Sequence, residues 1–471
     1  HICVEYGLDI FIDDVVAAFI SSGLGDDQVY LEVPEGFDCP PGYVIHLNAA
    51  VEGLKQAANK WTKKFDGILS SQGFEPVAKG AETCLYCKWV DDIPCIVARY
   101  VDDFGSGIHP TQHHIYEGLI SAMEAEGLEL HRLGNLVGQK ILGISVRAKE
   151  GSNNLILDQH DYILTMVDRF PEARDHEAVD TPMDPGLDLF DESSPLLETP
   201  TTYQSLIGAL IWLVCCTAPI LSTSVNRLAQ FMATPRELHL SAAIRVLAYA
   251  YQHLSEMELE IGGGGLELRG YADADFARDS DRKSVSGYVF FIGFTTLSWA
   301  SRKQKKVVRN STHAEHNALV ESVKEAKSLI QICAFFRARG VRPPPLELHQ
   351  DNLGCVAIAE KGQLSSLTKD MDISDLWVKQ EIDDEKITLV PTRTEHMLAD
   401  VLTKPMDAPR LRYFYPFFIK SVDPKPPKVA YMPRAGKLDQ GAKKKFQEWQ
   451  RNYMEQQRFP QRVALTVGVF L

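Results

Sequence analysis

Two adjacent carboxylates, Asp102 and Asp103, lie between an apolar run and a glycine-bearing stretch. The run Cys95–Arg99 has the composition of a strand, and Phe104–Gly107 allows a tight turn followed by a second strand. The pattern predicts a β-hairpin with both carboxylates at its tip. Such a pair can bind divalent cations, which in phosphoryl transfer clamp the attacking and leaving oxygens. A solvated Asp-Asp turn is the alternative, and the rest of the chain must decide between them.

Composition places the chain among globular proteins. Its 471 residues are 45% hydrophobic and 24% charged, which predicts roughly two to four domains. The net charge of −14 argues mildly against indiscriminate binding to nucleic acid. Two segments differ from this balance. Residues 302–309 form a basic run that either contacts a nucleic-acid backbone or is a solvated face, and 420–462 holds eleven Lys/Arg against four Asp/Glu.

Cysteine use and hydropathy indicate an intracellular chain without a membrane partner. The CxxC pair Cys84 and Cys87 has no second pair to complete a zinc site, which favours free thiols in a reducing compartment. The longest uncharged stretch, Thr199–Asn226, contains Gly208 and Pro219, so it predicts a buried helix followed by a turn rather than a membrane span. No secretion signal is visible, and a cytoplasmic particle, the nucleus or both are expected.

Strand and helix patterns alternate along the chain. Those of the first half are a helix at Leu54–Phe74, strands at Leu85–Trp89, Cys95–Val101 and Leu155–Leu157, a helix at Asp161–Phe170, and two helical pieces within Thr202–Leu254 broken near Pro219 and Pro235. A run of four glycines, Gly262–Gly265, then marks a flexible joint or a tight turn.

A new module begins after the glycines. Its expected elements are strands at Leu266–Tyr271, Gly287–Ile292 and Thr296–Trp299, a helix through Ala314–Ile330, a strand at Leu346–Gln350 and a helix at Leu353–Glu360. This order predicts a mixed α/β domain. Beyond Pro405 the chain becomes basic and weakly periodic, with one charged helix expected at Ala442–Gln457.

Short motifs follow one another in a fixed order. They are Asp14–Phe19, Gly53–Ala57 with Trp61, Cys84–Tyr86, Tyr100–Asp103, Leu142–Ile144, Thr181–Met183, Tyr203–Gly208 and Val225–Leu228. Together they resemble the reverse transcriptase of copia-type LTR retrotransposons, and the resemblance spans nearly all of residues 1–405. So many motifs in the family's order make the resemblance specific. Trp61 is nevertheless expected in the core rather than stacked on a base.

The resemblance implies a right-hand polymerase. Asp14 and Asp102 would hold two catalytic Mg²⁺ ions, with Asp103 assisting, while the primer's 3′ hydroxyl attacks an incoming deoxynucleoside triphosphate on an RNA template. Phe19 would lie under the sugar and disfavour ribonucleotides, and Gln56 would touch the nucleotide. Without the resemblance, Phe19 is equally well a core residue, and Asp14 is a helix cap or turn residue.

Four further acids resemble the ribonuclease H domain of the same elements. They are Asp273 in a strand, Glu315 at a helix start, Asp351 after a strand, and Asp400 in the run Ala399–Pro405. The resemblance implies that all four bind two Mg²⁺ ions, which activate water to cut the RNA of an RNA–DNA hybrid. Four converging carboxylates repel one another, so they make sense mainly around cations. Each alone can also be a solvated surface acid, as we expect for Asp275, Asp279 and Asp281.

Several positions depart from the family pattern. Thirteen residues precede Asp14, so we expect incomplete fingers and poor nucleotide affinity. Ala218–Leu221 replaces the family's Arg-Pro-Asp-Ile, His313 replaces a Glu, and Asp370 and Leu376 replace a His-rich loop. A truncated or partly decayed copy is therefore expected.

The predicted fold class is α+β or mixed α/β. We expect partial fingers and palm in 1–170, a thumb- or connection-like helical region in 171–262, a ribonuclease H-like domain in 263–405, and a basic tail of unknown role in 406–471. The predicted function is RNA-directed DNA synthesis with ribonuclease H activity. The alternative is a domesticated, non-catalytic scaffold or nucleic-acid-binding protein. Convergence of the four ribonuclease-type acids would favour the enzyme.

Overall fold

The computed structural model describes residues 1–40, 42–78, 84–337, 344–361 and 373–426. The expected helix at Ala442–Gln457 and the departure at Asp370 lie outside these residues. The chain divides into two compact units: unit 1 is 1–156 with 331–341, and unit 2 is 157–330 with 342–471. The fold is mixed α/β. The finer division at 170, 262 and 405 stays a prediction.

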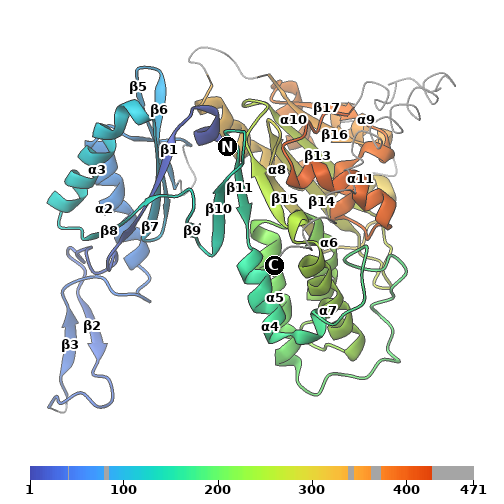
Figure 1. The fold of residues 1–471 in the computed structure, drawn as a ribbon, viewed down its shortest axis with the longest axis horizontal. Coiled ribbons are helices and arrows are strands. Elements are labelled where there is room, and N and C mark those ends of the chain that lie inside the picture. Colours follow the sequence, from blue (N-terminus) through green and yellow to red (C-terminus); the bar gives the residue numbers. More distant parts are fainter. Residues whose placement is uncertain (41, 79–83, 338–343, 362–372, 427–471) are drawn as a thin grey trace, which may run out of the picture. The chain divides into compact units, whose positions relative to one another are not determined.

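An antiparallel sheet organises unit 1 (Figure 1). Its strand order is β4-β5-β6-β7-β1-β8. The strands of unit 1 are β1 (Asp9–Val15), β2 (Val29–Glu32), β3 (Val44–Leu47), β4 (Glu75–Pro76), β5 (Leu85–Val90), β6 (Ile93–Tyr100), β7 (Asp103–Ile108), β8 (Leu130–Asn135), β9 (Lys140–Ile141) and β10 (Ile144–Ala148), and its helices are α1 (Ile2–Glu5), α2 (Ala57–Ser71) and α3 (His113–Ala125). β2 and β3 pair as a separate hairpin.

The predicted hairpin at the paired carboxylates is confirmed. β6 and β7 pair antiparallel, with Tyr100 opposite Asp103, so the turn consists of Val101 and Asp102. Val101 has a φ of +55°, a conformation that costs a β-branched residue on the order of 1 kcal/mol or more. The indole Nε1 of Trp61 donates a hydrogen bond of 2.6 Å to the Val101 carbonyl and holds this turn in place.

The core of unit 1 lies between the sheet and the neighbouring helices α2 and α3 (Figure 1). On α2 the buried residues Trp61, Phe65 and Leu69 recur every four positions, which places them on one helix face. Trp61 is 1% exposed, so its predicted core position is confirmed. The predicted helix at Leu54–Phe74 forms as α2, which begins later and ends earlier, at Ala57 and Ser71.

Unit 2 contains a five-stranded sheet of order β15-β14-β13-β16-β17. Its first three strands pair antiparallel and the rest parallel. Its strands are β12 (Glu258–Ile261), β13 (Leu268–Asp275), β14 (Val285–Ile292), β15 (Thr295–Lys303), β16 (Leu346–Gln350) and β17 (Ile387–Pro391), and its helices are α4 (His160–Arg169), α5 (Pro200–Cys216), α6 (Ser222–Ala229), α7 (Glu237–Gln252), α8 (Ser311–Phe335), α9 (Leu353–Lys361), α10 (Ile373–Asp383) and α11 (Ala408–Ile419). Two elements cross the division in the sequence: β11 (Leu155–Asp158), which precedes α4, and α8, whose residues from Gln331 onward belong to unit 1. The predicted strands and helices of the new module are confirmed.

The helical region before the sheet differs from its prediction. In place of two helical pieces, three helices form, α5, α6 and α7, because Pro219 starts a separate 3₁₀ turn and Pro235 ends the stretch before α7. In the segment before α5, Val179, Met183 and Leu189 join the buried core around these helices, although it lacks regular structure.

Helix α11 is an element that the sequence pattern does not predict. Its Phe414, Phe417 and Phe418 are buried in the same core as Tyr271 and Phe291 of the sheet. The stretch Thr199–Asn226 forms a core helix and a turn, as predicted. None of the helices in the described ranges has the length and apolar character that a membrane crossing requires.

Candidate active sites

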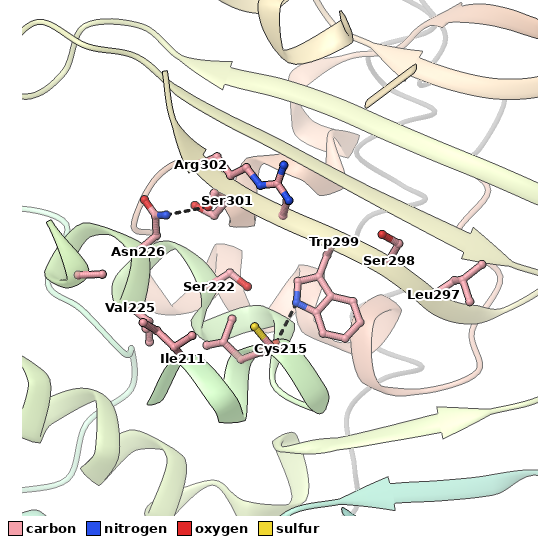
Figure 2. Close-up of a pocket in the computed structure, with 13 residues that line it drawn as sticks. Ile211, Cys215, Ser222, Val225, Asn226, Leu297, Ser298, Trp299, Ser301 and Arg302 are labelled. Carbon is pink, nitrogen blue, oxygen red and sulfur yellow. Dashed lines mark hydrogen bonds between the residues drawn. The ribbon is translucent and has the colours of Figure 1, made fainter. Parts of the chain in front are cut away.

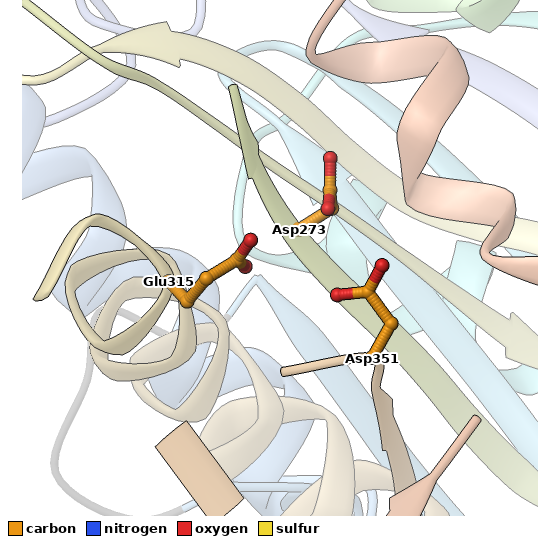
Figure 3. A group of neighbouring side chains, drawn as sticks. All are labelled: Asp273, Glu315 and Asp351. Atoms are coloured by element: carbon orange, nitrogen blue, oxygen red, sulfur yellow. The ribbon is translucent and has the colours of Figure 1, made fainter. Parts of the chain in front are cut away.

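Three carboxylates of unit 2 converge at one edge of the five-stranded sheet (Figure 3). Asp273 lies near the end of β13, Asp351 directly follows β16, and Glu315 lies in the first turns of α8. Because β13 and β16 run parallel, their carboxyl ends meet at the same edge. One oxygen from each side chain lies within 4.8 Å of the others. We call these three residues the strand-edge group.

Two members of the strand-edge group are buried, Asp351 is half-buried, and the charges of the three carboxylates repel one another. Asp273 is 2% exposed and Glu315 is 7% exposed. Burial, then Asp273 and Asp351, raise the pKa of Glu315 to about 10. Burial and Asp273 also raise the pKa of Asp351. Such pKa values are typical of carboxylates brought together for a cation, and an all-oxygen donor set fits Mg²⁺ or another hard divalent ion.

Hydroxyl groups orient two members of the strand-edge group. Thr403 Oγ1 donates to Asp273 Oδ2 at 2.6 Å, and Thr394 Oγ1 donates to Asp351 Oδ2 at 2.7 Å. Both threonines lie in the segment between β17 and α11. These contacts fix the side-chain directions of carboxylates that would otherwise turn apart.

Asp400, the fourth predicted ligand, is held by cations of the protein itself. It lies in a 3₁₀ turn, Leu398–Leu402, and is 0% exposed. Lys404 Nζ lies 2.8 Å from Asp400 Oδ1, and Arg410 of α11 pairs with Oδ2. Burial and Asp273, opposed by Lys404 and Arg410, raise the pKa of Asp400 to about 8. Asp400 thus lies near Asp273 without joining the strand-edge group, and its role as a metal ligand stays a prediction.

The polymerase-type acids of unit 1 form a second, looser arrangement. Asp14 on β1 lies opposite Asp103 on β7, and Val15 N donates to the Asp102 carbonyl at 3.1 Å, which brings the turn beside β1. Burial, then Asp102 and Asp14, raise the pKa of Asp103. We call Asp14, Asp102 and Asp103 the hairpin-tip group. Among the described residues these three do not form a three-ligand group of the kind seen at the strand edge.

Strand alternation separates Asp14 from its neighbour Asp13. Asp13 is 0% exposed, and Tyr116 Oη donates to both of its oxygens at 2.9 and 3.0 Å. Burial raises the pKa of Asp13. Asp14 points to the opposite face, where its side chain is 33% exposed and lies 3.8 Å from His131 Nδ1. Of the two acids, Asp14 is therefore the one available to solvent.

The two predicted nucleotide-binding residues are Phe19, which follows β1, and Gln56, which precedes α2. Phe19 is half-buried and packs against the core of unit 1 and a smaller cluster around Leu24 and Ala50. Gln56 is the residue before α2, and its side chain makes no capping hydrogen bond. Both roles stay predictions.

A cavity of about 490 Å³ in unit 2 is lined by none of the predicted catalytic or nucleotide-binding residues, although Arg302 of the basic run 302–309 contributes to it (Figure 2). It lies between α5, α6 and β15, and Asn226 Nδ2 donates to the Ser301 carbonyl across it at 2.8 Å. Trp299 contributes its ring and donates to the Val214 carbonyl at 3.0 Å. No carboxylate lines this cavity, so it cannot contribute to a metal site of the predicted kind.

Four residues that touch the acids are absent from the predicted site: Thr394, Thr403, Lys404 and Arg410. Thr403 and Lys404 lie in the run Ala399–Pro405, in which only Asp400 is a predicted ligand. The Thr403 hydroxyl and the Lys404 amine lie within four residues of the predicted ligand Asp400, and this proximity in sequence could have indicated that they contact the acids. Thr394 and Arg410 carry no such signal, because the sequence pattern predicts neither β17 nor α11.

The sequence of this chain matches those of known proteins. Residues 1–185 match the family model described as reverse transcriptase (RNA-dependent DNA polymerase). The retrovirus-related Pol polyprotein from transposon TNT 1-94 of Nicotiana tabacum is 29% identical over 417 residues, 84% of this chain and 30% of that protein. That from transposon RE1 of Arabidopsis thaliana is 32% identical over 407 residues, 85% of this chain and 27% of that protein. The chain thus spans less than a third of these polyproteins.

A shorter relative is covered almost completely. The putative transposon Ty5-1 protein of Saccharomyces cerevisiae is 31% identical over 317 residues, 66% of this chain and 99% of that protein. Among solved structures, the foamy viral protease-reverse transcriptase in complex with double-stranded DNA aligns with 82% of this chain and 57% of its own, at 11% identity and a TM-score of 0.47.

Proposed function

Since the chain belongs to the copia-type retrotransposon reverse transcriptase family, we propose that it cleaves the RNA strand of RNA–DNA hybrids and retains the palm of an RNA-directed DNA polymerase. The single observation that carries the nuclease activity is the convergence of Asp273, Glu315 and Asp351 within 4.8 Å. Two buried carboxylates and a half-buried one, this close together, favour a bound cation at neutral pH, since burial and Asp273 raise the pKa of Asp351 although Lys404 opposes this rise.

In this proposal Asp273, Glu315 and Asp351 would hold Mg²⁺, and Thr403 and Thr394 would orient two of these carboxylates. When bound, Mg²⁺ supplies an activated water and neutralises charge on the scissile phosphate. The Asp273 and Glu315 side chains are shielded from bulk water by the residues packed around them. Thr403 and Thr394 keep the Asp273 and Asp351 oxygens aimed inward.

The hairpin-tip group supports the polymerase part of the proposal. The strained turn at Val101 presents Asp102 to solvent next to Asp103 and Asp14. In the proposed reaction, Asp14 and Asp102 bind Mg²⁺, Asp103 assists, and the substrates are a primed RNA template and deoxynucleoside triphosphates. Phe19 and Gln56 are the proposed nucleotide contacts.

One observation favours the alternative, a non-catalytic nucleic-acid-binding protein. Asp400 is neutralised by Lys404 and Arg410, so it is less available to a metal ion than a free carboxylate. If this pairing persists with substrate bound, the site lacks its fourth ligand and hybrid binding would occur without cleavage.

The test is incubation of the purified chain with a hybrid labelled on its RNA strand, with Mg²⁺ or with EDTA. The proposal expects Mg²⁺-dependent shortening of the RNA and none in EDTA. A primer-extension reaction with an RNA template tests the polymerase part separately. A folded chain that binds the hybrid but neither cuts RNA nor extends a primer supports the alternative.

A further inference from the structure

A basic cavity in unit 2 lies at the loop that joins β13 to β14. It has a volume of about 510 Å³ and is lined by Arg278 and Arg282 from this loop, by Arg227 from α6, and by the segment 185–190. We call these three arginines and the space they line the arginine pocket. None of them belongs to either carboxylate group.

Arg227 is the buried member of the arginine pocket. It is 6% exposed, and its Nη2 donates to Asp279 Oδ1 at 2.7 Å. Its Nη1 is buried and has no hydrogen-bond partner among the described residues. Asp279 itself is 8% exposed, so the expectation that it is a solvated surface acid is wrong. A buried guanidinium donor without an acceptor costs free energy, so an acceptor that reached Nη1 would stabilise this arrangement.

The loop arginines add charge at the mouth of the cavity. Arg278 Nη2 donates to the Pro185 carbonyl at 2.9 Å, and its Nη1 is 3.8 Å from Asp275. The Arg282 side chain makes no hydrogen bond or ion pair within the described ranges, and its φ of +56° fixes an unusual backbone conformation.

Acids offset part of this charge. Two line the cavity, Asp188 and Asp279. Asp279 is paired with Arg227 and lies 3.5 Å from Lys303 Nζ, and Asp188 Oδ1 accepts the Phe190 backbone N–H at 2.9 Å. Arg282 is thus the arginine of the pocket that has no acidic partner among the described residues, and its planar guanidinium suits phosphate oxygens.

The position of the arginine pocket relates it to the strand-edge group. Arg278 follows Asp273 by five residues. Five residues span at most about 18 Å even when fully extended. Along a duplex each strand rises about 3.4 Å per nucleotide, so this distance corresponds to a few nucleotides at most.

We propose that the arginine pocket binds a backbone phosphate of the nucleic acid that lies across the strand-edge group, a few nucleotides from the scissile bond. The proposal rests on the proposed hybrid cleavage and adds a positioning contact outside the reacting atoms. Free inorganic phosphate shares the same chemistry and is the alternative source of the anion.

The test measures binding of a fluorescently labelled RNA–DNA hybrid in EDTA over a series of salt concentrations. The double variant Arg278→Gln/Arg282→Gln is compared with Arg174→Gln/Arg412→Gln, which removes two exposed arginines that line no part of the pocket. The pocket variant should bind about tenfold more weakly, and its slope of log K against log salt should flatten by about 0.9 for each phosphate that it no longer neutralises. The control variant should stay within about twofold of the parent.

Two outcomes overturn the proposal. The first is a pocket variant whose hybrid affinity and salt slope equal those of its control. The second combines two results: inorganic phosphate raises the melting temperature of the parent but not of the pocket variant, and the two proteins bind the hybrid equally well. That combination would assign the pocket to the free anion. EDTA prevents cleavage, so neither result depends on catalysis. If the parent does not cut the hybrid with Mg²⁺ but still binds it more tightly than the pocket variant does, only the proposed nuclease function is refuted.

Discussion

The strand-edge group and the hairpin-tip group are both sets of three carboxylates, but the protein holds them differently. Asp273 and Glu315 are buried on a sheet edge and a long helix, and threonine hydroxyls fix two members of their group. Asp102 is exposed on a two-residue turn. A site carried by packed elements keeps its geometry through the surrounding core, whereas a turn depends on a few local contacts. We therefore expect the nuclease site to be preorganised and the polymerase site to require its substrates.

The largest expected effect separates the two sites by activity. Asp273→Asn should lower hybrid cleavage by about a thousandfold or more, because the substitution removes one ligand of the proposed metal site. Primer extension should be unchanged, and Asp102→Asn should show the opposite pattern. Rates with labelled hybrid and with primed template check both. Equal loss of both activities in either variant would mean that the two groups do not act as separate sites.

A second prediction concerns the ion pairs of α11. Asp400→Asn should raise the free energy of unfolding less at pH 6 than at pH 9, because the pKa of about 8 means that, despite Lys404 and Arg410, the folded chain loses stability as this buried carboxyl ionises. Asp180→Asn is the matched control, since Asp180 pairs with Arg412 on the same helix but at the surface. Its cost should be under about 0.5 kcal/mol. Similar midpoints in urea for both variants at pH 9 would contradict the burial argument.

A third prediction uses the raised pKa of Glu315. The unfolded chain releases the Glu315 proton near pH 4.5, whereas the folded chain holds it until about pH 10. In the absence of a metal ion, the free energy of unfolding should therefore fall as the pH rises between these two values. Glu315→Gln should therefore raise the melting temperature by about 3 °C at pH 8 in EDTA, and by less at pH 5. Mg²⁺ should stabilise the parent more at pH 8 than at pH 6 and should do little for the variant. An equal Mg²⁺ effect in both proteins would contradict the assignment.

The smallest expected effect tests the hairpin turn. Trp61→Phe removes the hydrogen bond to the Val101 carbonyl while keeping an aromatic ring in the core. It should cost about 1 kcal/mol of unfolding free energy and lower primer extension without changing hybrid cleavage. Comparable losses of both activities would show that the turn has no special dependence on this hydrogen bond.

Most strongly patterned elements can be predicted from the sequence, but the contacts between them cannot. The hairpin around Asp102 and the helix containing Trp61 carry clear local signals, and both form as expected. Helix α11 escapes prediction because its aromatic-rich sequence has no simple polar face and includes Pro416. The pairing of Arg410 with Asp400, and the burial of Asp279 against Arg227, depend on tertiary packing that no local pattern encodes.

Cleavage of a labelled RNA–DNA hybrid by the purified chain and by its Glu315→Gln variant decides whether the strand-edge group is a nuclease site. Binding of the same hybrid in EDTA serves as the control for folding. We predict Mg²⁺-dependent cutting of the RNA strand by the parent, no detectable cutting by the variant, and equal hybrid binding by both. A parent chain that binds the hybrid yet leaves its RNA intact, or a variant that cuts as fast as the parent, would contradict this assignment.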